Sequence, residues 1–418
     1  MLATRRPPWA DLDPRITRVA IARAVNTLGL SLVMSFLAIY VVEERGYSAA
    51  LFGAIALVSN LGQSATNAWA GELSDRIGRM PLIIGALTVR SVVIIALGSL
   101  ILIDAPLWLL SITFVVSSAL RGCFEPVAYA LVADLVRPEQ RVAAYGLQRM
   151  GTNLGWAAGP ALGGLLSTVL PYGAVFYLAA LGMLVAAAVV GRVVDPRDPR
   201  QAPEPPPPRL RLRDSLRAAA AHPPMVALLA GTVVFALVHT QIFSALAIYV
   251  TRDLGLAKHE LGLLYTANGV LVLLLQWPAL DVIHAFGLGR VLVASSLTFA
   301  VGFALIGVAG GLAGMLVAIA VITVAEVLFA PAHQAAAAAA SDARRLGTGF
   351  GLVGFAQMIG VAFAPLIGGL LLDHMRAPAG ERALGIWLVI AALALVMAAI
   401  FALQARLAIA RQTTRDVG

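Results

Sequence analysis

Long apolar runs alternate with short polar segments along the whole chain. Each run holds about 20 or more mostly apolar residues, the length that an α-helix needs to cross a bilayer. The first run is too long, and its flanks too unlike a cleavage site, for a removable signal peptide, so we interpret it as a span. The pattern predicts twelve membrane-spanning helices, at residues 17–42, 50–71, 81–103, 107–133, 145–168, 174–193, 225–250, 259–281, 290–309, 312–338, 348–372 and 383–406.

The composition agrees with a lipid environment. Hydrophobic residues make up 60% of the 418 residues and charged residues 12%. A chain with so little polar side-chain material cannot cover a water-soluble surface, so we expect an all-α polytopic membrane protein. Its one cysteine, Cys123, excludes an intramolecular disulfide, and because it falls inside a predicted span we interpret it as a small buried hydrophobe.

The basic residues set the expected orientation. With both termini in the cytoplasm, most of the 30 Lys and Arg residues fall in cytoplasmic segments, which is the positive-inside pattern. The net charge of +8 is therefore a signal of topology and of contact with the lipid surface, and no nucleic-acid partner is expected. We expect a monomer in a bacterial inner (plasma) membrane, with both termini cytoplasmic.

The two halves of the chain repeat one plan. Residues 146–164 read GLQRMGTNLGWAAGPALGG, and 205 positions later residues 351–369 read GLVGFAQMIGVAFAPLIGG. The segment LAIYV occurs at both 37–41 and 246–250, and in both copies glycines follow it. Paired segments of this kind are typical of a duplicated membrane transporter.

A polar segment joins the two copies. Residues 195–223 are rich in Pro and Arg, a composition that favours an extended spacer beside an anionic inner leaflet. A Pro-rich ligand for an SH3-type domain is the alternative interpretation. The repeat and the linker together predict two pseudo-symmetric six-helix halves, at residues 1–194 and 224–418.

The loop between the second and third predicted spans carries a motif. It reads Gly71-Glu-Leu-Ser-Asp75-Arg76-Ile-Gly78-Arg79 and resembles the G-x-L-a-D-r-x-G-r-k signature of the major facilitator superfamily, with Met80 in place of a further basic residue. Its glycines allow a tight turn, and Asp75 suits the positive end of the third helix. We expect a conformational latch at the cytoplasmic surface, formed by Gly71, Asp75, Arg76, Gly78, Arg79 and Asp134. The second half keeps a remnant, Asp281 and Gly289-Arg290, with a longer loop between them.

The repeated glycine segment matches a second signature. The pattern G-x8-G-x3-GP-x2-GG is associated with exporters, and the chain is similar here to twelve-span drug:proton antiporters of the superfamily. Glycines recur at every fourth position, so they form a ridge on which another helix can approach closely. The proline of the segment bends the helix that carries this ridge. Either the ridge serves packing alone, or it governs the resting conformation and hence export. The matching residues are Gly146, Gly155, Gly159, Pro160, Gly163 and Gly164.

Ionisable residues lie in the middle of two predicted spans. Each costs on the order of 3 kcal/mol to insert, so such residues mark a pathway or a paired site. Arg121 and Glu125 are four residues apart, which predicts one helix face, and the 205-residue offset carries Arg121 onto Glu326. In the superfamily that the chain resembles, spans one, four, seven and ten line a central cavity, across which Arg121 and Glu326 would face one another.

These residues predict the proton chemistry. We expect Glu326 to be the principal proton carrier, Glu125 the second choice, and Arg121 the partner of both. The alternative is that Arg121 and Glu125 merely neutralise each other, while a local hydroxyl satisfies Glu326. Further polar candidates for the substrate cavity, each with a packing role as its alternative, are Arg23, Asn26, His239, Gln241 and His333.

The predicted function is secondary active transport of a small-molecule substrate. We expect a proton-coupled exporter of small amphipathic or cationic compounds that works by alternating access. Uptake or facilitated transport of a sugar, organic anion or other metabolite is the alternative, since one fold serves both directions. A membrane enzyme is a weaker candidate because the sequence has neither HExxH nor GxSxG, and the absence of a Walker motif argues against an ATP-driven pump. No cofactor or metal is expected.

Overall fold

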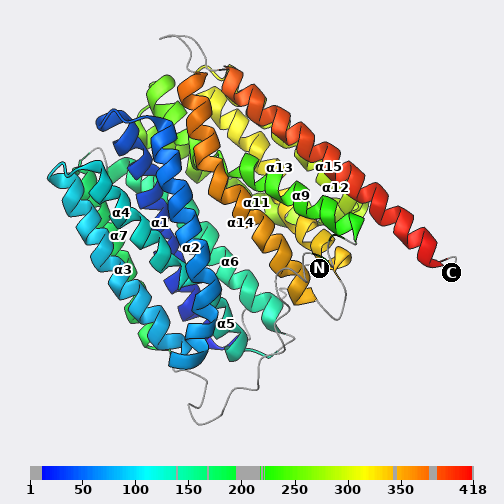
Figure 1. Ribbon diagram of the computed structural model, residues 1–418, viewed down its shortest axis with the longest axis horizontal. Coiled ribbons are helices and arrows are strands. Elements are labelled where there is room, and N and C mark those ends of the chain that lie inside the picture. The colour runs from blue at the N-terminus through cyan, green and yellow to red at the C-terminus, as the bar shows by residue number, and fades with distance from the viewer. Residues whose placement is uncertain are drawn as a thin grey trace, which may run out of the picture. The chain divides into compact units, whose positions relative to one another are not determined.

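The computed structural model describes residues 12–137, 140–166, 169–193, 222–341, 346–375 and 384–416, together with Arg217 and Ala220 (Figure 1). These residues are helical and include no strand. In chain order the elements are α1 Pro14–Ile39, η1 Tyr40–Glu44, α2 Ala49–Ile77, α3 Arg79–Leu102, α4 Leu107–Gly122, α5 Glu125–Leu135, α6 Arg141–Leu166, α7 Tyr172–Gly191, α9 Pro223–Thr240, α10 Ala245–Ile248, η3 Tyr249–Asp253, α11 Lys258–Phe286, α12 Leu288–Val308, α13 Leu312–Ala340, α14 Leu346–His374 and α15 Leu384–Asp416.

The chain divides into two compact units, and each unit includes a short segment from the other half of the sequence. Unit 1 contains α1, α3 to α7, α2 from Val58 onward, and Leu261–Gly269 of α11. Unit 2 contains η1 and the start of α2 (Val41–Leu57), α9, α10, η3, the rest of α11, and α12 to α15. Apart from Arg217, Ala220, His222 and Pro223, the predicted linker 195–223 lies outside the described residues.

Within the described residues, ten helical segments are long and apolar enough to cross a membrane. An eleventh is α11, whose two parts meet at 58° beside Pro278, where the ring removes a backbone hydrogen-bond donor. The predicted run 145–168 corresponds to α6, which is not among these segments; polar residues such as Gln148, Arg149 and Asn153 lower its hydropathy. The number of spans beyond eleven therefore stays a prediction.

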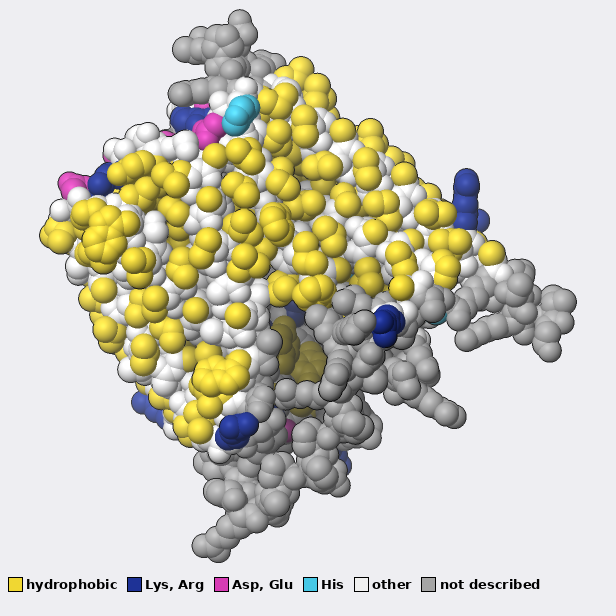
Figure 2. All heavy atoms as spheres, viewed as in Figure 1, with side chains coloured by type: hydrophobic (Ala, Val, Ile, Leu, Met, Phe, Trp, Pro, Cys, Tyr) yellow, Lys and Arg dark blue, Asp and Glu magenta, His cyan; other side chains and the backbone are white. Residues whose placement is uncertain are grey.

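Large apolar side chains are exposed along the helices of both units. Val92 on α3 is 61% exposed and Leu274 on α11 is 65% exposed. On the face drawn in Figure 2, hydrophobic side chains follow the length of the described helices and charged ones gather near helix ends. Lipid solvates such a surface, whereas water would drive it to associate. The protein is an integral membrane protein.

The duplicated segment LAIYV adopts the same local structure in both copies. Each copy leads into a π-helical turn, η1 in unit 2 after α1 and η3 after α10. Gly46 and Gly255 follow with φ angles of 68° and 65°, a backbone conformation that favours glycine. The repeat predicted from five identical residues is therefore present in the fold.

The fourth predicted span is broken where it was expected to be continuous. α4 ends at Gly122, Cys123 and Phe124 form a turn, and Glu125 begins α5. Pro126 explains the break, because its ring has no N–H and displaces the carbonyl one turn earlier. Arg121 and Glu125 therefore lie on either side of this turn, within one candidate span, Leu107–Leu135.

The break is not repeated in the second half. Pro331, the counterpart of Pro126, lies inside the continuous helix α13. Instead the seventh predicted span is interrupted between α9 and α10, at residues 241–244, whereas its counterpart α1 is continuous. The two halves therefore place their helix breaks at different points of the repeated plan.

The glycine ridge of α6 packs directly on α1. A Cβ added at Gly155 would lie 2.7 Å from the Ala24 carbonyl oxygen and 2.8 Å from the Leu28 backbone nitrogen. Ser31 Oγ donates a 3.0 Å hydrogen bond to the Gly155 carbonyl across the same contact. The predicted close approach is confirmed at Gly151, Gly155, Gly159 and Gly163, whose added Cβ atoms would all meet α1. The Pro160 side chain lies outside the described part of the structure.

The second copy packs in the same way. Gly360 of α14 lies against α9, and Gly368 lies against Gln241 and Ala245, which follow α9. Gln241 Nε2 donates a 2.9 Å hydrogen bond to the Ala364 carbonyl. Ala364 is the counterpart of Gly159. Each unit therefore holds one long helix against another through the same row of small residues.

Labelling of single cysteines should confirm the orientation. Cys123 is 8% exposed within the core of unit 1, so membrane-impermeant maleimide added outside intact cells should not modify it. In a Cys123→Ser background, Asp104→Cys should label from outside and Arg76→Cys only after the membrane is permeabilised. Both positions are exposed at helix ends. Rapid external labelling at position 76 would overturn the predicted topology.

Candidate functional site

A salt bridge joins two of the predicted residues inside unit 1. Arg23 Nη1 of α1 lies 2.9 Å from Glu125 Oε2 of α5, and the side chains are 1% and 36% exposed. The guanidinium group also lies 4.1 Å from the centre of the Tyr129 ring, a favourable cation–π distance. Glu125 was expected to pair with Arg121 one turn away, but its ion-pair partner in the structure is Arg23 of α1.

Two further arginines lie beside this salt bridge. Arg90 of α3 donates to Asn26 Oδ1 at 3.2 Å and to Ser117 Oγ at 3.3 Å. Arg121 of α4 donates to Gln63 Oε1 of α2. Arg90 interacts through charge with both Arg121 and Glu125. Sequence reasoning missed Arg90 as a site residue, although its place in the middle of an apolar run was the signal.

Unit 2 holds the second buried pair. His239 Nε2 of α9 lies 3.5 Å from Glu326 Oε1 of α13, with side chains 23% and 25% exposed. The contact is close enough for an ion pair when the histidine is protonated, but its geometry is not that of a hydrogen bond. The two residues were predicted as separate candidates, and the fold brings them together. The predicted approach of Arg121 to Glu326 involves two different units and stays a prediction.

An aromatic stack holds this pair in place. The rings of His239, Phe235, Phe329 and His333 follow one another with centroid distances of 5.2, 4.0 and 5.2 Å and interplanar angles of 23°, 16° and 16°. The first two residues belong to α9 and the last two to α13. Within each helix the two residues are four positions apart, and so they lie on one helix face. The stack fixes the distance between the helices that carry His239 and Glu326.

Two other cavity candidates make structural hydrogen bonds. His333 Nε2 lies 2.7 Å from Thr232 Oγ1, whose hydroxyl donates to the Leu228 carbonyl. Gln241 spans the contact between α9 and α14. Both residues are buried. Their contacts fit the packing alternative, in which a buried polar group is satisfied by neighbouring helices.

The Gly71–Arg79 motif forms part of the contact that was predicted for it. Arg79 Nε at the start of α3 donates to Asp134 Oδ2 near the end of α5 at 3.2 Å, and Arg79 also donates to Ser74 of α2. Gly78 has a φ of 94°, so the turn between α2 and α3 requires glycine. Arg76 is exposed. The side chain of Asp75, and Gly71 beyond its helical backbone, lie outside the described part of the structure.

The remnant of this motif differs from the prediction. A longer loop was expected between Asp281 and Gly289, but α11 continues to Phe286 and α12 begins at Leu288. Gly287 alone separates them, with a φ of 79°. The expected longer loop is wrong, because Gly287 can make the same tight turn as Gly78.

Replacing Asp134 with asparagine should slow turnover without a matching loss of binding. Asparagine removes the charge that holds Arg79 between three helix ends, and Asp134 stands at the opposite end of α5 from Glu125. We expect a fall in transport rate of about tenfold and a change in equilibrium substrate affinity of less than about twofold. Binding and transport assays on folded protein measure both.

The control for this variant is Asp281→Asn on α11, which changes the counterpart of Asp75 in the second copy of the motif. Asp281 is exposed and has no ion pair among the described residues. It should leave both quantities near the wild-type values. An equal loss of binding and transport in Asp134→Asn would contradict the latch.

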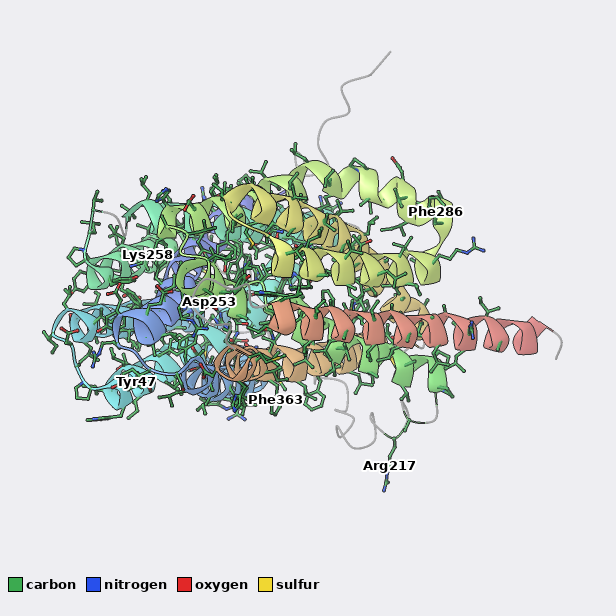
Figure 3. All side chains as sticks on the ribbon, turned by 90° about the horizontal axis from the view of Figure 1, so that it is seen from above. Tyr47, Arg217, Asp253, Lys258, Phe286 and Phe363 are labelled. Atoms are coloured by element: carbon green, nitrogen blue, oxygen red, sulfur yellow. The ribbon has the colours of Figure 1, made fainter. Side chains whose placement is uncertain are left out.

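Sequence reasoning missed a set of polar contacts at one end of unit 2. Lys258 Nζ lies 3.0 Å from Glu44 Oε1, and Thr251 donates to Glu43. Asp373 accepts hydrogen bonds of 3.1 and 2.7 Å from the backbone N–H groups of Ala49 and Ala50, and so caps the start of α2. Glu43, Thr251 and Asp373 line a cavity of about 730 Å³ at this end. Tyr47, Asp253 and Lys258 mark this end in Figure 3, and Phe286 and Arg217 mark the other.

This end of unit 2 joins segments from the beginning, middle and end of the chain. No motif in the sequence predicts these contacts, because each of the residues lies in a separate loop or helix end. Its contacts hold the η1–α2 corner to η3 and α14. In the described part of the chain, no group of three or more His, Cys, Asp or Glu side chains could hold a metal ion.

Comparison with known sequences defines the class of protein. The sequence profile of the Major Facilitator Superfamily matches residues 19–250 and 228–416. The chain therefore belongs to the Major Facilitator Superfamily, and it is a transporter. The family assignment drawn from the cytoplasmic and glycine motifs is confirmed.

Its relatives cover most of the chain at low identity. The uncharacterized MFS-type transporter YqjV of Bacillus subtilis (strain 168) is 22% identical over 374 residues, which are 88% of this chain and 89% of that protein. The multidrug resistance protein MdtH of Salmonella typhi is 26% identical over 356 residues, 84% of each chain.

Solved structures share the fold. A bacterial homolog to the human lysosomal transporter Spinster, in an inward-facing and unoccupied conformation, aligns over 97% of this chain and 98% of its own with a TM-score of 0.71 and 15% identity. A mutant of the nucleoside transporter NupG aligns over 93% of this chain and 98% of its own with a TM-score of 0.78 and 11% identity. At these identities the likeness concerns the fold alone.

Proposed function

We propose that this transporter is a proton-coupled exporter of small amphipathic compounds. The observation that carries the proposal is the His239–Glu326 pair, a carboxylate and an imidazole within 3.5 Å in the middle of membrane helices. Ionisable side chains at such depth are expensive to insert and mark proton or substrate pathways. Glu125 with Arg23 supplies a second carboxylate, in unit 1.

The pair in unit 2 suits proton carriage better than the pair in unit 1. Glu125 contacts a guanidinium group, whose charge does not change during a proton cycle. Glu326 faces an imidazole, whose charge changes with its own protonation. Glu326 and His239 can therefore take up and release a proton together, and Glu326 is the principal carrier, with Glu125 the second choice and Arg121 close to it.

Alternating access is the mechanism proposed for this chain. In this proposal the chain forms twelve spans in two six-helix halves, with the latch at Arg79 and Asp134 on the cytoplasmic side of an inner membrane and with both termini inside. The repeated packing of α6 on α1 and of α14 on α9 supports two halves with one plan. The likeness to a multidrug resistance protein supports export of small organic compounds.

Transport of an organic anion is the second candidate. The observation that favours it is the excess of arginine in unit 1, where Arg23, Arg90 and Arg121 lie near one carboxylate. Export by exchange with protons and transport of an anion are compatible, since the first concerns the coupling and the second the cargo.

Transport in proteoliposomes tests the proposal. Purified protein is reconstituted, a pH gradient is imposed, and accumulation is measured against a panel of anionic, neutral and cationic aromatic compounds. A proton-coupled exporter should move at least one compound against its gradient, and a protonophore should abolish that movement. Transport that is indifferent to the pH gradient for every transported compound would contradict proton coupling and favour facilitated transport.

A further inference from the structure

The positive charge within unit 1 exceeds what its own residues neutralise. Arg23, Arg90 and Arg121 come from α1, α3 and α4 and converge near Glu125. Among the described contacts of these three guanidinium groups, Glu125 is the one carboxylate. Their other hydrogen-bond partners are neutral: Asn26, Ser117 and Gln63.

Several donors in this cluster are also buried without an acceptor. Arg23 Nε, Arg23 Nη2 and Arg121 Nε have no hydrogen-bond partner among the described residues. The Arg23 side chain is 1% exposed, so bulk water does not solvate these groups. Buried donors of this kind are costly to leave unsatisfied. The planar guanidinium fork matches the oxygen atoms of a carboxylate, phosphonate or sulfonate.

Aromatic rings lie next to the unsatisfied donors. The Arg23 guanidinium carbon is 4.1 Å from the Tyr129 ring centre and 5.9 Å from that of Phe124. Glu125, 36% exposed, meets Arg23 through Nη1 alone. The cluster thus combines excess positive charge, unsatisfied donors on Arg23 and Arg121, and aromatic rings beside Arg23.

We propose that Arg23 and Arg121 bind the anionic group of an amphipathic organic acid, which is the cargo of the transporter. This inference rests on the proposed transport function and names the charge of its substrate. Glu125 is then an internal competitor of the ligand for Arg23. The alternative cargo, an amphipathic cation, would instead need Glu125 as its counter-ion.

Binding of three matched probes tests the charge preference. Naphthylacetate, naphthylethylamine and naphthylethanol share one ring and differ in the charge of a short tail. They are titrated calorimetrically into the purified full-length protein in lipid nanodiscs, and empty nanodiscs correct for partitioning. We expect the acid to bind at least about tenfold more tightly than either of the others. The proposal is wrong if the amine binds as tightly as the acid, or if the acid does not bind above the empty-nanodisc level.

Glutamine variants locate the site and separate the two substrate classes. Glu125→Gln should tighten binding of the acid several-fold, because it removes a competing negative charge and keeps a hydrogen-bond acceptor. An anion site without Glu125 as competitor, or a cation site, predicts unchanged or weaker binding of every probe. Arg121→Gln should weaken the acid by at least about tenfold.

Arg23→Gln by itself would leave Glu125 without its partner and is prone to misfold. The double variant Arg23→Gln with Glu125→Gln removes the salt bridge as a whole, and it should still lose affinity for the acid. Arg149→Gln, an arginine of α6 outside the cluster, is the matched control and should bind the acid like the wild type. Retention of acid binding in both the double variant and Arg121→Gln would overturn the proposal.

The same preparations distinguish this inference from the proposed coupling. Acid binding that depends on Arg23 and Arg121, without accumulation driven by a pH gradient, would leave the anion site standing and refute proton coupling. Driven accumulation of the amine that survives in the arginine variants would do the reverse.

Discussion

Replacing Glu326 with glutamine should abolish transport driven by a pH gradient while substrate binding and exchange persist. Glutamine keeps the shape of the side chain and its contact with His239, but it cannot take up a proton. We expect driven accumulation in proteoliposomes to fall by at least about tenfold, because the coupled step loses its proton carrier. Counterflow exchange of labelled substrate, which needs no net proton movement, should remain near the wild-type rate.

Two further variants show whether the role belongs to Glu326 alone. His239→Gln should shift the pH dependence of driven transport, since it removes the imidazole 3.5 Å from the carboxylate. If Glu326→Gln still accumulates substrate at the wild-type rate and Glu125→Gln does not, the roles of the two carboxylates are reversed. If both variants remain fully driven, proton coupling through these carboxylates is wrong.

Replacing Gly155 with valine should destabilise the protein severely. The added Cβ would lie within 2.8 Å of the backbone of α1 at Ala24 and Leu28, and backbone atoms cannot rotate away. Overpacking of this kind costs roughly 1–3 kcal/mol or more, so we expect a clear fall in melting temperature or in the yield of folded protein. Thermal unfolding followed by size-exclusion chromatography measures the effect.

Gly146 of the same signature provides the control. A Cβ added there meets nothing within 4 Å, and Gly146→Val should be nearly neutral for stability. Gly155→Ala separates the two interpretations of the ridge. Loss of transport in stable Gly155→Ala protein would show that the ridge governs conformation, whereas parallel loss of stability and transport would show packing alone. Equal stability of Gly155→Val and Gly146→Val would contradict the packing seen between α1 and α6.

The repeated glycine signature shows which part of a helix contact a local sequence pattern can predict. Small residues at every fourth position define a helix face whatever lies opposite, so a close helix contact could be predicted from residues 146–164 alone. The identity of the partner helix could not be predicted, because nothing in the segment specifies α1. The structure supplies it through Ala24, Leu28 and Ser31, which all lie on α1 against the glycines of α6.

For the charged residues, too, the sequence predicted one part of the site and not the other. Apolar surroundings identified Arg23, Arg121, Glu125 and Glu326 as exceptional, since each interrupts a run long enough to cross the bilayer. Their pairing was predicted from spacing along one helix, and that failed for Arg121 and Glu125. A new helix, α5, begins at Glu125, and Glu125 pairs with Arg23, which lies 102 positions away in the chain.

The sequence by itself determined the membrane environment, the helical class, the superfamily, the repeated plan and the tight turn at Gly78. These follow from hydropathy, residue spacing and backbone conformation, which are properties of short segments. Only the tertiary structure decided which side chains meet: Arg23 with Glu125, His239 with Glu326, and Asp373 with the start of α2. The physical reason is that a side-chain pair depends on the rotation and register of two packed helices, and many distant residues set these together.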